Sequence, residues 1–109
     1  IVAKVQALAP AFRDGLLALA GRACVGHVRS VGLIGALELV ADQATRTPFP
    51  PARKAGARLA QLALEQGLIV RAMGDVVGLC PPLIITAAEL ADLFARLTRA
   101  MDLFEAELN

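Results

Sequence analysis

The last quarter of the chain carries the pattern that most constrains the fold, a continuous apolar stripe at helical spacing. The stripe recurs every three or four residues and consists of Leu90, Leu93, Phe94, Leu97, Met101, Phe104 and Leu108. Thr86 and Glu89 precede it with the Thr-x-x-Glu spacing of a capping box. A long helix is therefore predicted from Thr86, with the stripe in the core. Its charged residues are left for the solvent side: Asp92, Arg96, Arg99 and Glu105.

Two earlier segments also have helical spacing. The segment from Val2 to Ala20 places five apolar residues on one face: Val5, Leu8, Phe12, Leu16 and Leu19. Pro10 either kinks one long helix there or opens a second helix at its first turn. The segment from Ala52 to Gln66 does the same with Ala55, Leu59, Leu62 and Ala63, and Gly67 suits its end.

Between the helices lie two pairs of short strand-like runs. The first pair is Val25 to Val31 and Leu33 to Val40. In the second run, alternation puts Leu33, Leu37 and Leu39 on one face and Ile34, Glu38 and Val40 on the other. The second pair is Leu68 to Arg71 and Val76 to Cys80, with a turn over 73–75 and a stop at Pro81 and Pro82. Asp42 to Pro51 reads as a loop.

This order of elements predicts an α+β domain with a small antiparallel sheet of three to four strands and helices packed on one face. The connection within each strand pair is too short for a parallel crossover, so each pair should be antiparallel. A length of 109 residues fits one domain.

The composition predicts that part of the surface is covered by a partner. Hydrophobic residues make up 57% of the chain and charged residues 19%. A membrane-spanning helix needs about 20 consecutive apolar residues, whereas the best run, Val31 to Ala41, is short and contains Glu38. The apolar excess therefore favours a sheet face that packs against another domain or subunit.

Other partners and compartments are disfavoured. The net charge is +1, without a basic stripe interleaved with aromatic residues, so nucleic acid is not an expected partner. No signal peptide is visible, and no membrane partner is expected. Cys24 and Cys80 lie in apolar contexts without metal-ligand spacing, so we expect buried free thiols and a cytoplasmic location.

Few residues carry an obvious chemistry, and neither a catalytic residue nor a metal site is predicted. His27 has no partner at a telling spacing, which favours a structural role. Glu38 needs a partner if its strand face is covered, or else faces water on an edge strand. Arg71 ends an apolar run just before a turn. Its guanidinium could bind a carboxylate with two parallel bonds, although the pattern alone favours a solvent-facing arginine.

Three segments together resemble the small domain of class III aminotransferases, and the resemblance covers nearly the whole chain. They are Val28 to Val40, Gly67 to Arg71 and Leu79 to Thr86, in matching order and spacing. The likeness is strongest to the ω-transaminases, whose small domain carries the same Cys-Pro-Pro block after the corresponding arginine. The chain is thus identified as residues 1–109 of a C-terminal small domain, a fragment of a larger protein, which fits its start at Ile1 without an initiator Met.

The resemblance implies a fold-type-I homodimer that transfers an amino group between an amine or amino acid and a keto acid or aldehyde. Its cofactor would be pyridoxal 5'-phosphate, with the Schiff-base lysine and the phosphate-binding residues upstream of this chain. Arg71 is expected to bind the substrate carboxylate and to swing away for apolar groups, and Met73 to line the substrate pocket. Neither Lys4 nor Lys54 lies in a matching segment, so the chain alone is predicted to be inactive.

Two alternatives remain at this stage. The chain could be a stand-alone, non-catalytic module for ligand binding or oligomerisation, in which Arg71 still captures a carboxylate. A membrane-surface protein is less consistent with the sequence, because no basic amphipathic helix is present. A reading frame that continues upstream and contains a lysine after a strand would favour the enzyme.

Overall fold

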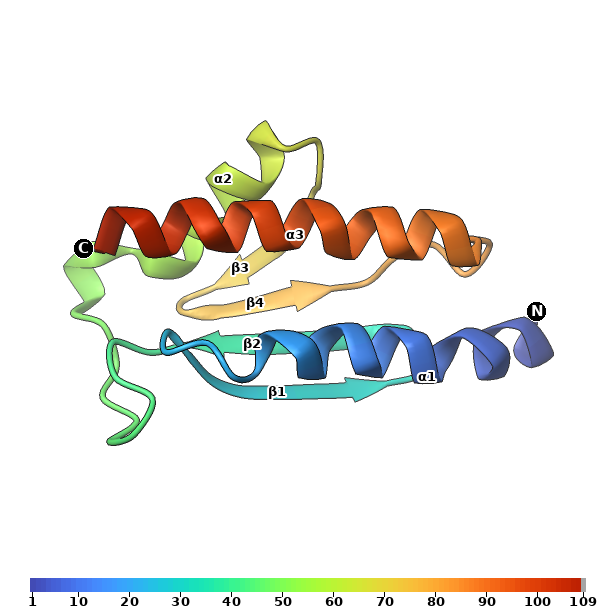
Figure 1. Ribbon diagram of the computed structural model, residues 1–109, viewed down its shortest axis with the longest axis horizontal. Helices are drawn as coiled ribbons and strands as arrows, with labels where there is room; N and C mark the ends of the chain where they lie inside the picture. Colours follow the sequence, from blue (N-terminus) through green and yellow to red (C-terminus); the bar gives the residue numbers. More distant parts are fainter. Residues whose placement is uncertain (109) are drawn as a thin grey trace.

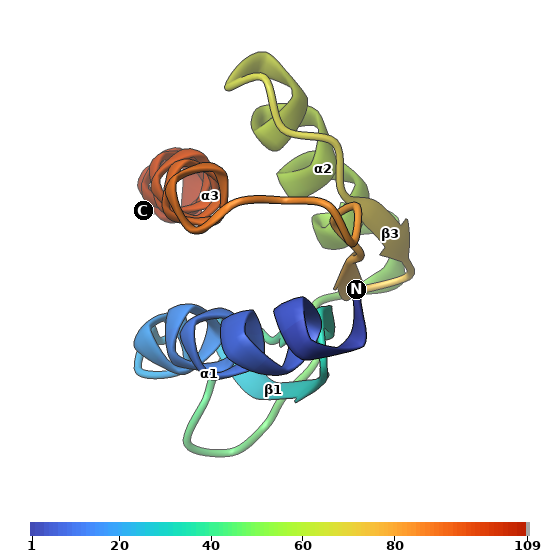
Figure 2. The same ribbon diagram turned by 90° about the vertical axis from the view of Figure 1, so that its right-hand side faces the viewer.

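A computed structural model describes residues 1–108 and places three α-helices on one side of a four-stranded sheet (Figures 1 and 2). The elements in chain order are α1 (Val2–Leu19), β1 (Val25–Val31), β2 (Ile34–Leu39), a 3-10 helix (Pro51–Arg53), α2 (Ala55–Glu65), β3 (Arg71–Met73), β4 (Val76–Leu79) and α3 (Ala87–Leu108). The predicted α+β class is confirmed.

The sheet has the order β1-β2-β4-β3, and every neighbouring pair is antiparallel. β1 and β2 form one hairpin through Gly32, and β3 and β4 form another through Gly74. Both glycines have a positive φ, 58° and 61°, which a residue with a side chain adopts only at a cost. The hairpins join through the β2–β4 pairing, where Leu37 lies opposite Val77.

The core lies between the sheet and the helices. Leu37, Leu39, Val77 and Leu79 point from the sheet into it, and all four are buried. From α3 come five buried residues of the predicted stripe, Leu90, Leu93, Leu97, Met101 and Phe104. α1 packs so closely on β2 that a side chain at Gly35 would collide with Leu16 and Phe12. The packing of helices on one face is thus built from the predicted apolar positions.

The capping box at the start of α3 forms as predicted. The Thr86 backbone N–H donates to Glu89 Oε1 at 3.0 Å, and the Glu89 N–H donates to Thr86 Oγ1 at 3.1 Å. These two bonds satisfy amide groups that the first helical turn leaves without an intrahelical partner.

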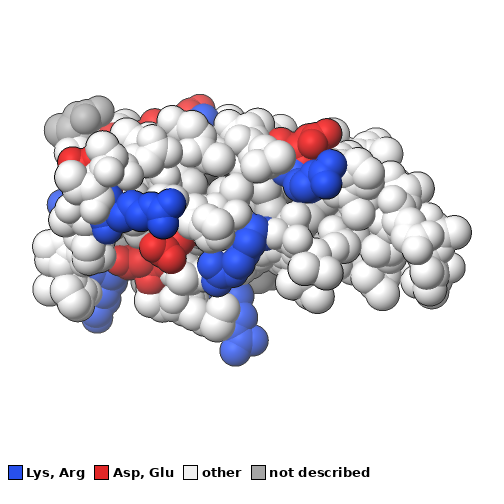
Figure 3. Space-filling model, turned by 90° about the horizontal axis from the view of Figure 1, so that it is seen from below, with Lys and Arg blue, Asp and Glu red and all other residues white. Residues whose placement is uncertain are grey.

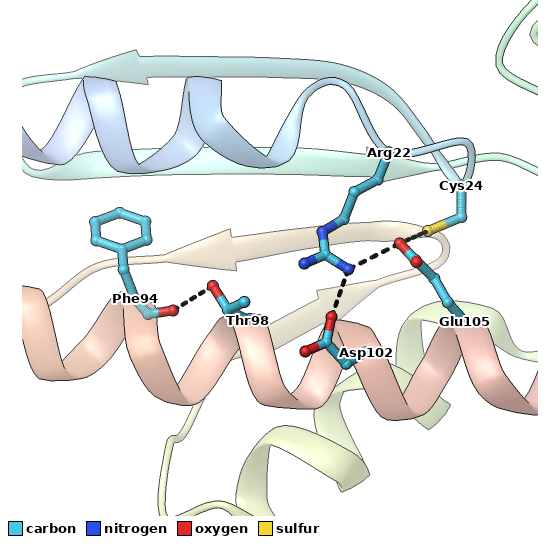
Figure 4. A network of polar contacts seen from close by, with 6 residues as sticks. All are labelled: Arg22, Cys24, Phe94, Thr98, Asp102 and Glu105. Atoms are coloured by element: carbon cyan, nitrogen blue, oxygen red, sulfur yellow. Dashed lines mark hydrogen bonds and ion pairs between the residues drawn. The ribbon is translucent and has the colours of Figure 1, made fainter.

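A polar network ties the connection between α1 and β1 to α3 (Figure 4). Arg22 Nη1 donates to Asp102 Oδ1 at 2.8 Å and to Glu105 Oε1 at 3.1 Å. The Cys24 thiol donates to the same Glu105 oxygen at 3.6 Å. Glu105, predicted on the solvent side of its helix, is therefore partly covered by Arg22.

The structure settles one open prediction about α1 and corrects the predicted start of α2. α1 is one helix despite Pro10, which settles the choice that the sequence left open. α2 begins at Ala55 rather than Ala52, because Pro51–Arg53 forms a 3-10 turn and Lys54 has a φ of 50°. A left-handed residue interrupts a right-handed helix, so α2 starts only after it.

Three strand details were predicted wrongly. β3 starts at Arg71 rather than Leu68 and includes Met73, which was assigned to the turn. β4 ends at Leu79, before Pro81 and Pro82. Because proline has no N–H to donate, β4 does not continue the hydrogen-bonded ladder alongside residues 68–70. Val40 is buried rather than on the face of Ile34, because it fills the space beside Gly26 at a bulge in β1.

On the face drawn in Figure 3, charged side chains are unevenly distributed. In Figure 3, charged side chains gather toward the end that carries the 42–50 loop, whereas the end formed by the first turns of α1 shows none. Ile1 and Val2 are exposed there. Among residues 1–108, no helix combines the length and the apolar character needed to cross a bilayer.

Candidate functional site

Among residues 1–108, no element covers the face of the sheet that points away from the helices. Antiparallel partners point to the same side of a sheet, so the register defines this open face as Arg29, Val31, Ile34, Ala36, Glu38, Arg71, Met73, Val76, Gly78 and the adjoining Ile69 and Cys80. Val31 and Ile34 are 82% and 62% exposed. Such an apolar face typically packs against a partner.

A groove of about 560 Å³ runs over the open face. Its walls include both predicted substrate-binding residues, Arg71 and Met73, and its floor includes Ala36 and Gly78. Both floor residues are small, since Ala36 has only a methyl group as its side chain and Gly78 has none. The groove is therefore hollowed over the two central strands and bordered by longer side chains at the sheet edges.

Arg71 is the first residue of β3 and is exposed. Its cross-strand partner is Gly78, so the guanidinium has open space beside it. The side-chain hydrogen bonds and ion pairs within residues 1–108 involve other arginines, such as Arg22, Arg58 and Arg96, and not Arg71. A planar donor without a partner from its own domain is suited to a carboxylate from outside.

Met73 lies two residues further along β3, on the same face as Arg71, and is 56% exposed. A thioether side chain adapts its shape to different apolar groups. The structure thus brings the two predicted residues into one groove, while their role toward a substrate stays a prediction.

His27 and Glu38 are cross-strand partners on β1 and β2. Both belong to the side of the sheet that carries the open face, next to the groove rather than in its lining. Glu38 is half-buried and His27 exposed. β2 lies between β1 and β4, so the prediction that Glu38 faces water on an edge strand is wrong as to the strand.

Sequence reasoning missed two residues of the groove, Arg29 and Cys80. Cys80 was expected to be buried, but it is exposed, because it lies two residues after Gly78 and so on the open face. Arg29 alternates with Val31 along β1, a signal that was present in the sequence. Its alignment with Arg71 across the sheet could be seen only once the register of four strands was known.

Neither lysine of the chain lies in the groove. Lys4 is in the first turn of α1, where its Nζ donates to the Ile84 carbonyl at 2.9 Å. Lys54 precedes α2. Within residues 1–108, no three His, Cys, Asp or Glu side chains come together as a metal site. The chemistry that this groove offers is recognition by arginine and by apolar contact.

Known proteins match this chain in sequence. The sequence model of the family described as Aminotransferase class-III matches residues 1–101. A diaminobutyrate–2-oxoglutarate transaminase from Halomonas elongata is 45% identical over 87 residues, which are 78% of this chain and 19% of that protein. A probable mitochondrial γ-aminobutyrate transaminase 3 from Oryza sativa subsp. indica is 32% identical over 99% of this chain and 21% of its own length.

Solved structures match the fold. A PMP-bound aminotransferase from Vibrio fluvialis superposes with a TM-score of 0.93 and 39% identity, over 97% of this chain and 24% of that one. An ω-aminotransferase from Paracoccus denitrificans gives a TM-score of 0.94, also at 39% identity, over 97% of this chain and 24% of its own.

The chain therefore spans about a fifth of the length of the curated relatives that it matches. The family model and the relatives cover nearly all of this chain, and the fold of the solved aminotransferases superposes on it almost completely. On this evidence the chain belongs to the class-III aminotransferase family.

Proposed function

We propose that this chain is the C-terminal small domain of a transaminase that moves an amino group between an amine or amino acid and a keto acid or aldehyde. The observation that carries the proposal is Arg71, an exposed arginine that makes no side-chain hydrogen bond or ion pair within residues 1–108, on a groove with a floor of Ala36 and Gly78. In the proposed enzyme, Arg71 binds the substrate carboxylate and the open face forms one wall of the active site.

The proposed cofactor is pyridoxal phosphate, which supplies an electron sink when bound. The residues of this chain do not fit that group by themselves, because Lys4 is held at Ile84 and Lys54 lies outside the groove. The Schiff-base lysine and the phosphate ligands would come from the large domain. We therefore expect the isolated chain to be inactive.

Arg71 and Met73 together would accept two kinds of substrate. A carboxylate receives two parallel hydrogen bonds from the guanidinium, an arrangement that a neutral side chain cannot reproduce. For a substrate with an apolar group instead, the long arginine side chain can turn away toward solvent, and Met73 then offers an apolar surface. Arg71 would thus distinguish keto acids from simple aldehydes.

The partners of the open face would be the large domain and a second subunit of a homodimer. Val31, Ile34 and Ile69 are exposed apolar residues on that face, and covering them would remove apolar surface from water. A cytoplasmic location stays a prediction, since the relatives include plant proteins named as mitochondrial.

The test is Arg71→Gln in the full-length protein loaded with pyridoxal phosphate. Loss of a charge-assisted hydrogen-bond pair, worth about 1.5–3 kcal/mol, should raise the KM for a keto acid about 10- to 100-fold. The kinetics with a simple aldehyde should not change, and Arg71→Lys should recover part of the affinity for the keto acid.

The matched control is Arg13→Gln, which removes an exposed arginine from α1 on the helix side of the sheet. It should leave both substrates unaffected. Equal losses for the keto acid and the aldehyde in Arg71→Gln would mean that the arginine only supports the fold.

A further inference from the structure

We propose that Arg96 of α3 is a positioning residue, which binds the end of α2 and thereby fixes the place of Arg71 on the groove. This inference rests on the proposed function and deepens it, because it names what keeps the carboxylate-binding arginine in position. The sheet alone holds Arg71 weakly. β3 is an edge strand of three residues that pairs only with β4, and Arg71 is its first residue.

The segment that leads into Arg71 is not fixed by the sheet either. Residues 68–70 precede β3 and do not belong to a strand. Leu68 and Val70 pack partly against the core, but apolar contacts are not directional and allow a segment to slide. The position of Arg71 therefore depends on where this segment starts, at the end of α2.

The end of α2 has a defined geometry. The Gly67 N–H donates to the Leu64 carbonyl and the Leu68 N–H to the Ala63 carbonyl, both at 2.9 Å. This is the hydrogen-bond pattern of a Schellman motif, and Gly67 has the positive φ, 83°, that the motif requires. Neither bond uses the carbonyl of Gln66, the last residue before this turn.

Arg96 supplies the donor for that carbonyl from α3. Its Nη1 donates to the Gln66 oxygen at 2.7 Å, and its Nε donates to Asp92 Oδ2 at 2.8 Å. A cation at the C-terminus of a helix also interacts favourably with the helix dipole. A side chain at Gly67 would collide with Arg96 Nη1, so the guanidinium lies directly against the backbone where the chain leaves α2.

The opposite end of the β3–β4 hairpin is held by the start of α2. The Gly56 N–H donates to Asp75 Oδ1 at 3.4 Å, and a side chain at Gly56 would collide with the Gly74 carbonyl. The hairpin thus contacts α2 at its turn and follows α2 at the Arg71 end. At the Arg71 end, the directional contact to α3 is the bond from Arg96.

The test compares pyruvate with butanal as amino acceptors in the full-length protein loaded with pyridoxal phosphate. If Arg96→Gln leaves the Arg71 guanidinium correctly placed in roughly one molecule in three to one in ten, the KM for pyruvate should rise about 3- to 10-fold. The kcat should not change, and neither should the kinetics with butanal. Arg96→Lys retains a cationic donor for the Gln66 carbonyl and should recover most of the affinity for pyruvate.

The matched control is Arg99→Gln, which removes the same charge from the next turn of α3. Arg99 Nε donates to the side-chain oxygen of Gln66 at 3.2 Å and not to the carbonyl that ends α2. It should leave the KM for pyruvate unchanged.

Two further measurements show whether Arg96 acts through Arg71. The double variant Arg71→Gln/Arg96→Gln should be no worse with pyruvate than Arg71→Gln alone, because the arginine to be placed is already gone. Hydrogen exchange of peptides covering residues 66–73 should be faster in Arg96→Gln, whereas peptides from α1 should not change.

The outcomes separate this inference from the proposed function. If Arg71→Gln raises the KM for pyruvate while Arg96→Gln changes neither that KM nor the exchange, the inference is refuted and the proposed function stands. Equal losses for pyruvate and butanal in Arg96→Gln, or additive losses in the double variant, would also refute it. If Arg71→Gln leaves pyruvate unchanged, the proposed function fails, and Arg96 then has no carboxylate-binding arginine to place.

Discussion

At the scale of single residues, the two cysteines show that an apolar sequence context does not by itself decide burial. Cys24 is buried beside Glu105. Burial, and to a smaller extent this carboxylate, raises the pKa of the Cys24 thiol to about 11. Cys80 is exposed on the open face. Both lie in apolar sequence, so local composition predicts burial for both, and only the packing of Cys24 against α3 separates them.

This difference predicts unequal reactivity. At pH 8 a thiol with a pKa of about 11 is ionised in about one molecule per thousand, and the thiolate is the attacking species. In the folded isolated chain, dithiodipyridine should therefore modify Cys80 rapidly and Cys24 only as the protein opens. Absorbance of the released thiopyridone gives both rates.

Cys80→Ser is the matched control, and it should abolish the fast phase and keep the slow one. A fast phase that survives in Cys80→Ser would show that the Cys24 thiol is accessible and not held against α3.

Residue roles were predictable only in part. The sequence singled out Arg71 and Met73, and the structure brings them into one groove. It did not single out Arg29, because the position of Arg29 on the groove follows from strand pairings that join residues far apart in the chain. A pairing register is a long-range property, whereas a spacing of three or four residues is local.

At the scale of elements, the same reasoning explains why helices were predicted better than strands. The apolar stripe and capping box of α3 lie within one segment, and both form as expected. The limits of β3 depend on where β4 has free N–H groups, and the prolines after β4 set those limits. The start of α2 depends on Lys54, whose left-handed conformation has no sequence signature of its own.

The capping box predicts a pH-dependent contribution to stability. The backbone and side-chain hydrogen bonds with Thr86 hold the pKa of Glu89 below its usual range. The Glu89 carboxylate therefore stabilises the fold above the pKa of an unfolded glutamate, about 4.3, and the contribution is lost as pH falls through the lower folded value. Glu107 contributes in the same direction, because Arg58 lowers its pKa.

Thermal unfolding of the chain between pH 7 and pH 3 checks this contribution. Glu89→Gln should lower Tm at pH 7 and lose less on acidification than the wild type. Thr86→Ala should cost about 1 kcal/mol at neutral pH. Glu65→Gln, at the end of α2, is the control. If Glu89→Gln and the wild type lose the same Tm on acidification, the capping carboxylate does not carry the effect.

At the scale of the whole molecule, the chain is one-sided. Its helices lie on one face of the sheet (Figure 2), with the buried core between the helices and the sheet. The other face carries exposed apolar residues such as Val31 and Ile34. The apolar excess of the composition predicts a surface that a partner covers. The structure shows exposed apolar residues on the open face of the sheet, where such a partner could pack. The occupant of that surface could not be deduced from composition, because burial by a partner domain and burial by a second copy require the same apolar residues.

The most direct measurement is a crystal structure of the full-length protein with pyridoxal phosphate and a non-reactive carboxylate such as butyrate. The account predicts that Val31, Ile34 and Ile69 are covered by the large domain or the second subunit. It also predicts that the butyrate carboxylate accepts two hydrogen bonds from the Arg71 guanidinium. An open face left in solvent, with the Arg71 guanidinium remote from the cofactor and the ligand, would contradict the account.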